Sequence, residues 1–334
     1  MRREPLTVGV FSPSVLLRAG RRLGLVDAGV REEPVASSPA QFAALLAGEL
    51  DAALTSPDNA IAHRYVRGDP LDVRIVSAVD RGLGLALYAR PGLASAAELK
   101  GRVAGVDVPD SGFAFALYAA MEAVGLSRGD YRTVALGATP RRLEALLGGG
   151  CAATMLNAGS DLRAEDAGAV RLAGVPRPYL GTVLCALGTS LDGPRGVTHG
   201  GAPDGTHGIT HGVTHGGAPG GVWALAAGLR ETARVILAGD ADDVVAEEAA
   251  AALRLPPGTA LRYLGRLKDP DEGLVADGRA DAASLSTVLG LRRRHGTAPD
   301  PDHDQDHDHD HDLIIRSLLA GGPPDGGPLD RGGR

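Results

Sequence analysis

Short apolar runs alternate with helical stretches along the chain, and this alternation limits the possible folds more than any other feature. Strand-like runs at 6–11, 31–37 and 51–56 are each followed by a stretch at helical spacing, at 14–29, 38–50 and 57–68. Strands that alternate with helices in this way form a mainly parallel sheet with helices packed on its faces. The sequence therefore predicts an α/β fold.

A second set of the same kind begins near residue 95. Its strand-like runs lie at 102–108, 131–137 and 151–159, with helical stretches at 110–127 and 138–150 between them. The runs VRIVSAVD and GLALYAR, which separate the two sets, are predicted to form a pair of strands. A later run, RPYLGTVLCALG, is expected to leave the second set. Two sets of this kind predict two lobes, each a mainly parallel sheet flanked by helices.

Two segments cannot contribute to a packed core. Residues 196–221 repeat Gly, Thr and His without apolar periodicity, and residues 297–334 form a tail rich first in His and Asp, then in Gly and Pro. We expect disorder there, and an expanded repeat tolerated in surface loops is the favoured interpretation. Metal binding is the alternative, because imidazole binds Zn²⁺ and Ni²⁺, although a structural zinc site needs fixed geometry. The candidate metal ligands are His199, His207, His211, His215, His303, His307, His309 and His311.

The charge balance argues against a nucleic-acid partner. The net charge is −7, whereas a nucleic-acid footprint needs a basic face. The sequence has no apolar run of membrane-spanning length, and MRREPLTVGVFSPS lacks the pattern of a signal peptide. We therefore expect no membrane insertion and a cytoplasmic protein as written, or a protein of the cell envelope if the true start lies upstream. Cys151 and Cys185 form no CxxC motif and pair only if the fold brings them together.

Polar side chains lie between the ends of the predicted strands and the starts of the helices that follow them. In open α/β sheets, ligands lie beyond the carboxyl ends of the strands, against helix N-termini whose free N–H groups favour polar or anionic groups. Two lobes with such strand ends predict a cleft between them. Plain helix capping is the alternative, worth about 1 kcal/mol per residue, and Thr139 is the natural cap of the stretch 138–150. The candidate ligand-binding residues are Ser12, Ser14, Ser37, Ser38, Thr55, Ser56, Asp58, Asn59, Asp110, Ser111, Thr139 and Asn157.

Three segments of the chain resemble the type II periplasmic-binding fold, and in particular the substrate-binding proteins of ABC importers for nitrate, sulfonates, taurine and thiamine-pyrimidine precursors. The resemblance covers residues 6–188 well and the C-terminal helices loosely. It rests on three patterns. The first is a helix and strand joined by Gly-Glu-x-Asp, where x is any residue. The second is the segment ELKG that opens the second lobe, and the third is a segment in which Leu is followed by Gly. The matching residues are Gly48, Glu49 and Asp51, then Glu98, Leu99, Lys100 and Gly101 followed by Ser111 and Gly112, and finally Leu146 and Gly150.

The resemblance implies where the lobes divide. The chain would cross between lobes near residues 80–90 and again near 178–188. The first lobe would comprise residues 1–85 and 186–296, including the low-complexity insert at 196–221. The second lobe would comprise residues 90–180, and residues 297–334 would form a tail. Ligand would lie in the cleft, and the lobes would close on it by a hinge motion.

The resemblance implies a monomeric solute-binding protein without a cofactor, which captures one small polar or anionic molecule and has an ABC permease as a possible partner. An intracellular binder is a variant of this hypothesis. The contrasting hypothesis is a cytoplasmic enzyme on the same fold, similar to a thiamine-pyrimidine-precursor synthase or a decarboxylase. The hydroxyl-rich cleft suits a sulfonate or carboxylate, with Arg141 as a candidate positive contact. The alternative ligand is a flat heterocycle donating to Asp58 and flanked by Phe11, Phe42, Phe113 and Tyr65.

Overall fold

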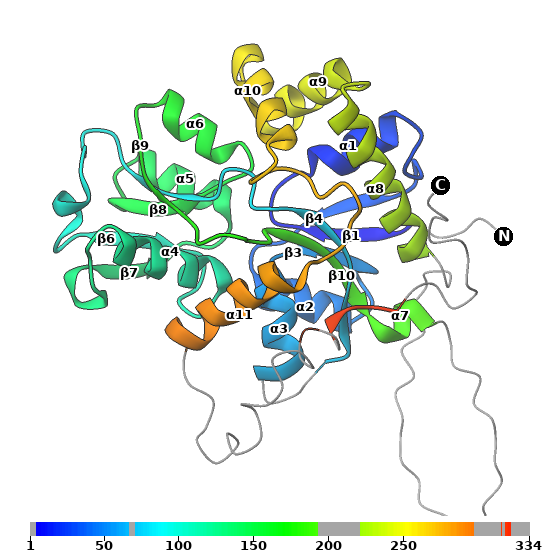
Figure 1. Cartoon of the computed structure of the whole chain (residues 1–334), viewed down its shortest axis with the longest axis horizontal. Helices are drawn as coiled ribbons and strands as arrows, with labels where there is room; N and C mark the ends of the chain where they lie inside the picture. Colours follow the sequence, from blue (N-terminus) through cyan, green and yellow to red (C-terminus); the bar gives the residue numbers. More distant parts are fainter. Residues whose placement is uncertain (1–4, 67–70, 193–220, 297–314, 316–317, 322–334) are drawn as a thin grey trace, which may run out of the picture.

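The strands of this protein form two five-stranded mixed sheets (Figure 1). The computed structural model describes residues 5–66, 71–192, 221–296, 315 and 318–321. In the first sheet the strand order is β2-β1-β3-β10-β4, and in the second it is β7-β6-β8-β5-β9. The first sheet contains β1 (Thr7–Val10), β2 (Arg31–Pro34), β3 (Ala52–Thr55), β4 (Val73–Asp80) and β10 (Thr182–Leu187). The second contains β5 (Ala86–Ala89), β6 (Val103–Val106), β7 (Arg132–Ala135), β8 (Ala153–Leu156) and β9 (Val170–Gly174).

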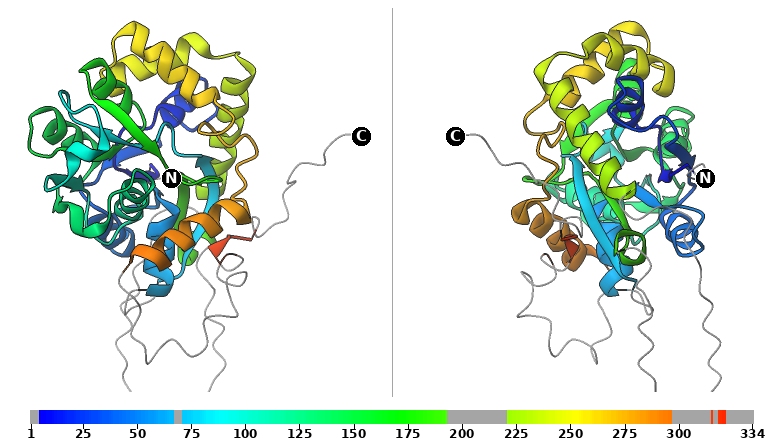
Figure 2. Two further views of the ribbon diagram at one scale, coloured as in Figure 1. Left: turned by 60° about the vertical axis from the view of Figure 1, so that its left-hand side comes forward. Right: turned by 90° about the vertical axis from the view of Figure 1, so that its right-hand side faces the viewer.

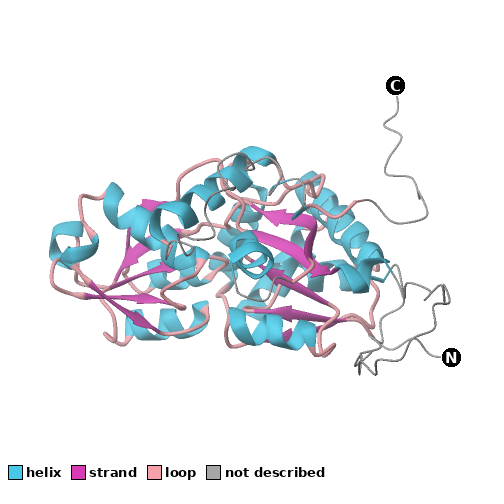
Figure 3. Cartoon of the chain, turned by 90° about the horizontal axis from the view of Figure 1, so that it is seen from below, coloured by secondary structure: helices cyan, strands magenta, loops and turns pink. Residues whose placement is uncertain are grey.

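Both sheets follow the same plan. In the first, β1 pairs in parallel with β2 and β3, while β10 is antiparallel to β3 and β4. In the second, β6 pairs in parallel with β7 and β8, while β5 is antiparallel to β8 and β9. Seen from below, the two sheets lie at opposite ends of the long axis with helices on their faces (Figure 3). The predicted two-lobed α/β fold is thus confirmed.

The connection between β4 and β5 corrects one prediction. These strands do not pair: β4 is an edge strand of the first sheet, and β5 lies inside the second. The turn between them has positive φ at Gly82 (117°), Leu83 (47°) and Gly84 (81°), a run that only glycine-rich sequence adopts readily. The chain thereby crosses from one sheet to the other instead of folding back as a hairpin. The return crossing was predicted correctly, because β10 leaves the second set and joins the first sheet between β3 and β4.

Serine side chains set the starts of the helices that follow the strand ends. The hydroxyl oxygens of Ser14, Ser37, Ser56 and Ser111 accept hydrogen bonds from backbone N–H groups in the first turns of α1, α2, α3 and α4. Each of these serines therefore satisfies a donor that the helix itself leaves unpaired. The helices concerned are α1 (Val15–Arg22), α2 (Ser38–Leu46), α3 (Pro57–Ile61) and α4 (Gly112–Ala123).

Thr139 does not cap its helix, contrary to the sequence-based expectation. The N-cap of α5 (Thr139–Leu147) is Ala138, which has no side-chain hydrogen bond to offer. Thr139 is instead the first helical residue, and its hydroxyl accepts a hydrogen bond from Nη2 of Arg142 at 2.9 Å. Pro140 follows at a first-turn position, where its fixed φ suits a helix start and its missing N–H costs nothing.

The C-terminal helices join the two lobes (Figures 1 and 2). Helices α8 and α9 pack on α1 beside the first sheet, α10 packs on α9 and also on α6, and α11 packs on both α3 and α4. Helix α11 begins only after Asp281, whose carboxylate accepts a hydrogen bond from the N–H of Ser284 and so caps the helix. The remaining bounds are α6 (Ser160–Asp166), α7 (Gly188–Asp192), α8 (Gly221–Ala238), α9 (Asp242–Leu253), α10 (Pro257–Lys268) and α11 (Ala282–His295), with one π-helical turn (Ala62–Val66) and 3₁₀ turns at Ala96–Leu99 and Arg128–Asp130.

One hydrophobic core runs through both lobes. It contains Phe42 of α2, Leu87 of β5, Phe115 of α4 and Leu285 of α11, none more than 1% exposed. A second core fills the space between the first sheet and α1, α8, α9 and α10, and a smaller one lies under α5 and α6. Burial of apolar side chains by α4 and α11 therefore holds the lobes against each other as well as stabilising each one.

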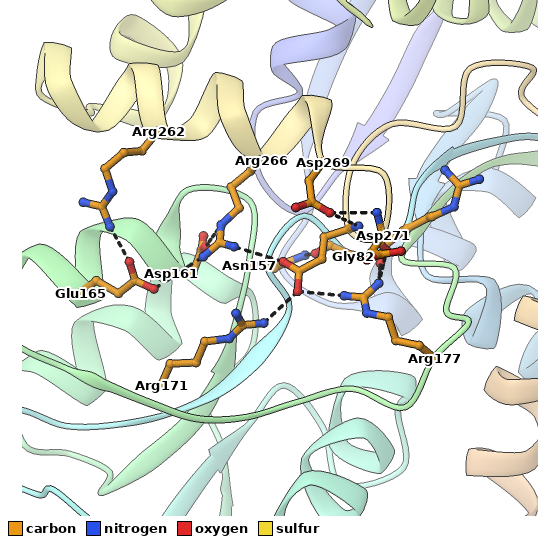
Figure 4. A network of polar contacts seen from close by, with 12 residues as sticks. Gly82, Asn157, Asp161, Glu165, Arg171, Arg177, Arg262, Arg266, Asp269 and Asp271 are labelled. Atoms are coloured by element: carbon orange, nitrogen blue, oxygen red, sulfur yellow. Dashed lines mark hydrogen bonds and ion pairs between the residues drawn. The ribbon is translucent and has the colours of Figure 1, made fainter.

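A network of ion pairs also connects the lobes, on the side of α6 and α10 (Figure 4). Glu272, in the loop after α10, lies within ion-pair distance of Arg171 on β9, Arg177 in the return crossing and Arg266 on α10. A second group joins Arg262 on α10 to Glu165 on α6. The network thus connects the second sheet, the crossing segments and α10.

The predicted lobe boundaries stay a prediction. The first sheet takes its strands from residues 7–80 and 182–187, and the second from residues 86–174. Helix α11, which was assigned to the first lobe, contacts elements on both sides. Residues 196–220 of the predicted insert and almost all of the predicted tail lie outside the described residues, and so do all eight histidines proposed as metal ligands.

Candidate functional site

A cavity lies where the strand ends of the two lobes meet. It is small, about 30 Å³, which is room for the charged group of a small ligand. Its walls come from the end of β1, the starts of α2, α3, α4 and α5, and the loop after β6. The lining residues are Phe11, Ala36, Ser37, Ser38, Ser56, Asn59, Asp107, Val108, Ser111, Gly112, Phe113, Ala138, Thr139 and Arg142.

Arg142 supplies the positive charge of this cavity. Its side chain is 1% exposed, and it forms no ion pair with any carboxylate of the described residues. Neutral oxygens hold the guanidinium in place: Nη1 donates to the carbonyl of Gly137 at 2.8 Å, Nη2 donates to Thr139, and Nε and Nη2 both donate to the carbonyl of Met155 at 3.4 Å. These four bonds use four of the five N–H groups of an arginine, so one on Nη1 is left over.

Burial without an ion pair distinguishes Arg142 from Arg292, the other buried arginine among the described residues, which pairs with Asp58. Burial lowers the pKa of its guanidinium, and the negative charge of Asp107 works in the opposite direction. An arginine nevertheless stays protonated in a protein, because its ordinary pKa lies above about 12. A buried cation without a direct ion pair costs free energy, which a bound anion recovers.

Ser38 adds an unpaired hydroxyl to the same cavity. It is the first residue of α2 and only 6% exposed, and its Oγ has no hydrogen-bond partner among the described residues. The first turns of α2, α4 and α5 all contribute lining residues. Helix N-termini carry partial positive charge and free N–H groups, so all three favour a negatively charged group in this cavity.

Asp107 is the one carboxylate in the lining of this cavity. It follows β6 and is half-buried, and its Oδ1 accepts a hydrogen bond from the hydroxyl of Ser111. The same hydroxyl oxygen accepts the N–H of Ala114 as the cap of α4. The proton of Ser111 is therefore committed to Asp107, and Oδ2 of Asp107 accepts no hydrogen bond from the described residues.

A second compartment continues the cleft past Phe11, Ser56, Phe113 and Thr139, which line both spaces. It is larger, about 100 Å³, and its walls are mainly apolar, with contributions from the end of β1, the start of α1 and from α10. Asp80, which is 2% exposed, belongs to this wall and accepts a hydrogen bond from the N–H of Gly82 at 2.8 Å. Burial raises the pKa of the Asp80 carboxyl to about 6, although bonds from Thr182 and Gly82 oppose the shift.

The structure brings most of the predicted ligand-binding residues together around these two compartments. Six of them line the first cavity, namely Ser37, Ser38, Ser56, Asn59, Ser111 and Thr139. Ser12, Ser14, Thr55 and Asn157 line the second, as do Ser56 and Thr139. Asp58 and Asp110 line neither. Ligand contact by these residues stays a prediction, and for Ser14, Ser37, Ser56 and Ser111 the capping alternative is also correct.

Asp58 has a different partner from the ligand we expected. Its carboxylate is fully buried and accepts two hydrogen bonds from Arg292 of α11, Nε to Oδ1 at 2.6 Å and Nη2 to Oδ2 at 2.8 Å. Asp110 is about half exposed and lies 4.0 Å from Nη1 of the same arginine. Both acids therefore complement a residue that lies more than 180 positions away in the sequence, which local patterns cannot reveal.

The four aromatic side chains proposed to flank a heterocycle do not all reach the cleft. Phe11 and Phe113 line both compartments, whereas Phe42 is buried in a stack on His63 with ring centroids 3.8 Å apart, and Tyr65 is exposed. The two cysteines are free and buried: Cys151 lies in the loop between α5 and β8, and Cys185 lies on β10. In the part of the chain that the structure describes, no group of three or more His, Cys, Asp and Glu side chains is arranged to hold a metal ion.

No described helix is long and apolar enough to cross a membrane.

Sequence reasoning chose the wrong arginine of the pair Arg141–Arg142. Arg141 is exposed, whereas Arg142 is buried beside the cavity. The signal was present in the sequence, because Thr139, Arg142, Leu143 and Leu146 share the spacing i, i+3, i+4, i+7 that marks the buried face of a helix. An arginine on that face must meet acceptors or an anion in the interior.

Several solved structures resemble this chain along most of its length. The alkanesulfonate-binding protein SsuA from Xanthomonas axonopodis pv. citri, bound to MOPS, is 16% identical, with 96% of each chain covered and a TM-score of 0.62. The periplasmic nitrate-binding protein NrtA from Synechocystis PCC 6803 is 11% identical, with 93% of this chain and 85% of that chain covered and a TM-score of 0.66. The desulfurization enzyme DSZB is 16% identical, with 95% and 99% covered and a TM-score of 0.57.

No protein-family model matches the sequence, and no curated protein matches it either. At identities of 11–16%, the likeness to solved structures is one of fold. The two sheets, the double crossing between them and this likeness together confirm the predicted resemblance at that level: the chain has the two-lobed periplasmic-binding fold.

Proposed function

We propose that this chain is a solute-binding protein that captures one small organic anion in the cleft between its lobes. The observation that carries the proposal is Arg142, a buried guanidinium beside a cavity, held by neutral oxygens and without an ion pair among the described residues. The anionic group would accept the remaining Nη1 proton of Arg142 and the unpaired hydroxyl proton of Ser38. Sulfonates and carboxylates both have oxygens that suit this donor set.

The second compartment would hold the body of the ligand. Its mainly apolar wall and its larger volume suit a short aliphatic or aryl group attached to the anionic head. The proteins of similar fold are described as binding an alkanesulfonate-type ligand and nitrate, which is consistent with an anion in this chain. Because one protein of similar fold is a desulfurization enzyme, catalysis is the contrasting hypothesis. The lining of the two compartments contains no cysteine or histidine among the described residues, which favours binding.

The importer context is part of the proposal. The neighbours of similar fold include an alkanesulfonate-binding protein and a ligand-binding component of an ABC-type import system from Staphylococcus aureus. We therefore propose an ABC permease as the partner and, of the two locations that the sequence leaves open, the cell envelope rather than the cytoplasm. Co-purification of a permease with the tagged chain, and its location in cell fractions, test this part independently of the ligand.

The binding proposal is tested first by native mass spectrometry of the full chain, purified without a metal column. A small organic mass at 1:1 stoichiometry that EDTA does not remove would identify the ligand. Titration calorimetry with nitrate, acetate, lactate, phosphate, methanesulfonate and 2-hydroxyethanesulfonate then provides defined probes.

The matched variants are Arg142→Met and Arg141→Met. We expect Arg142→Met to weaken binding of every anion that binds by about 100-fold, since one charge-assisted contact is worth about 2–3 kcal/mol. Arg141→Met should bind as the unmodified chain does, because Arg141 is exposed. Thermal unfolding of both variants checks that the fold is retained. Equal affinities for Arg142→Met and Arg141→Met would remove the basis of the proposal.

A further inference from the structure

The cavity that contains the buried cation also contains a carboxylate. Arg142 and Asp107 both line it, yet they form no ion pair with each other. Each has its own local partners instead: Arg142 donates to Thr139 and to backbone carbonyls, and Asp107 accepts from Ser111. Two opposite charges thus line one space of about 30 Å³ without pairing directly.

The hydrogen bonds of the cavity leave two kinds of group open. Two donors are open, the remaining Nη1 proton of Arg142 and the hydroxyl of Ser38. One acceptor is open, Oδ2 of Asp107, because Ser111 donates to Oδ1 only. A carboxylate oxygen has no proton to give, so it accepts from a ligand and repels a ligand oxygen that carries negative charge.

An anion with no proton to donate can satisfy the donors of this cavity but not its acceptor. Nitrate or an alkanesulfonate would satisfy Arg142 and Ser38 but would bring charged oxygens towards Asp107. A ligand with an N–H or O–H group next to its anionic group would satisfy both the donors and the acceptor. A site built to accept a ligand hydrogen bond rejects an isosteric analogue that lacks the donor far more strongly than an apolar wall rejects an extra hydroxyl.

We infer that Asp107 is a specificity-determining residue, and that the ligand is an oxyanion which carries a hydrogen-bond donor beside its charged group. The donor lies on Asp107 and the oxygens lie on Arg142 and Ser38. Ser111 is a positioning residue, because its hydroxyl fixes the rotation of the Asp107 carboxylate while capping α4. This inference rests on the proposed function, and it separates this chain from binders of donor-free anions.

Three pairs of probes of matched shape test the selection. Lactate and 2-methylpropanoate differ only by a hydroxyl in place of a methyl group, and so do 2-hydroxyethanesulfonate and 1-propanesulfonate. Inorganic phosphate and sulfate form an inorganic pair, since phosphate keeps a proton at neutral pH. Calorimetry on the full chain should show tighter binding of the donor-bearing member, by about 30-fold or more, in each pair whose anionic group is accepted.

The variants are Asp107→Asn and, as the matched control, Asp110→Asn. Asparagine keeps the shape of the side chain and an oxygen to accept from Ser111, so the thermal midpoint should change little. Without the negative charge, the preference within a pair should fall to about 3-fold or less, mainly because the donor-free member binds better. Asp110 lies outside the cavity, so Asp110→Asn should keep the preference of the unmodified chain.

The results distinguish this inference from the proposed function. If both members of a pair bind the unmodified chain equally and Arg142→Met weakens both, the anion site stands and the selection by Asp107 is refuted. If the preference is present but survives in Asp107→Asn, another residue provides it and the inference is again refuted. If no probe binds the unmodified chain and none co-purifies, the proposed function itself fails.

Discussion

Arg292 and Asp58 form a bidentate ion pair across 234 positions of sequence, with heavy-atom distances of 2.6 and 2.8 Å. The guanidinium also lies over the ring of Phe115 in α4, 4.9 Å from its centroid. Arg292 therefore ties the last described helix, α11, to α3 of the first lobe and to α4 of the second. This contact explains why the acid after β3 is buried although it belongs to a strand-end cluster that otherwise faces the cleft.

Asp58→Ala should lower the free energy of unfolding by about 3–5 kcal/mol, because it leaves the buried Arg292 guanidinium with only the half-exposed Asp110 carboxylate, 4.0 Å away. The double variant Asp58→Leu/Arg292→Met should recover much of this loss, since an apolar pair needs no compensation. Urea unfolding followed by circular dichroism measures both. If Asp58→Ala unfolds at the same urea concentration as the unmodified chain, the ion pair does not hold α11 in place.

Asp161 should make the protein less stable as the pH rises through neutrality. It is fully buried on α6, and burial raises the pKa of its carboxyl to about 7, although the charge of Arg266 opposes the shift. A carboxyl that binds its proton more tightly in the folded state stabilises the fold below the unfolded pKa, and this contribution disappears as the pH rises through about 7.

Asp161→Asn removes this dependence, since an amide stays neutral and its oxygen can still accept the N–H of Gly159. Between pH 5 and pH 8 the unmodified chain should lose about 3 kcal/mol more stability than the variant, because each pH unit between pH 5 and the folded-state pKa of about 7 is worth about 1.4 kcal/mol. Urea titrations of both proteins at the two pH values measure the difference. A parallel fall in both proteins would show that other groups cause the dependence.

Gly112→Ala should disturb the contact between the lobes. A Cβ atom at this position would lie 2.6 Å from Cβ of Asp58 and 3.0 Å from Oγ of Ser56, so α4 and α3 would have to separate. We expect a loss of about 1–3 kcal/mol in the free energy of unfolding, as for other overpacked sites. The same variant should bind the anion more weakly, because α3 and α4 both line its cavity.

Gly290→Ala, in the exposed part of α11, is the control for this substitution. No atom lies within 4 Å of the added Cβ, so the better helix propensity of alanine should raise stability by up to about 1 kcal/mol. Thermal unfolding compares the two variants. Equal midpoints would mean that the approach of α3 and α4 is not close enough to exclude a methyl group.

Glu272→Gln should weaken the ion-pair network between the lobes (Figure 4). Its carboxylate lies 2.8 Å from Nη2 of Arg171, 3.0 Å from Nη2 of Arg177 and 3.3 Å from Nη1 of Arg266. Because the partners are partly exposed, we expect a loss of only about 1–2 kcal/mol, smaller still in 1 M salt. Glu231→Gln, which breaks an exposed i,i+3 pair on α8, should have almost no effect. A loss that salt does not reduce would indicate packing rather than charge.

Local sequence patterns determined the strand–helix alternation, the two-lobed class and the helix starts at Ser14, Ser37, Ser56 and Ser111. These features depend on side chains two to four positions apart, so a short window of sequence contains both partners. The same reasoning predicted that β10 leaves the second set. Of the twelve candidate residues that it named, ten line the two compartments.

Only the tertiary structure decided which charged groups face the cleft. The burial of Arg142 rather than Arg141, the pairing of Asp58 with Arg292 and the place of Asp107 in the cavity all depend on how the helices pack. The separation of β4 from β5 likewise depends on which sheet offers each strand a partner. Capping is settled within one helical turn, whereas the cost of burying a charge is settled only by groups that folding brings from distant parts of the chain.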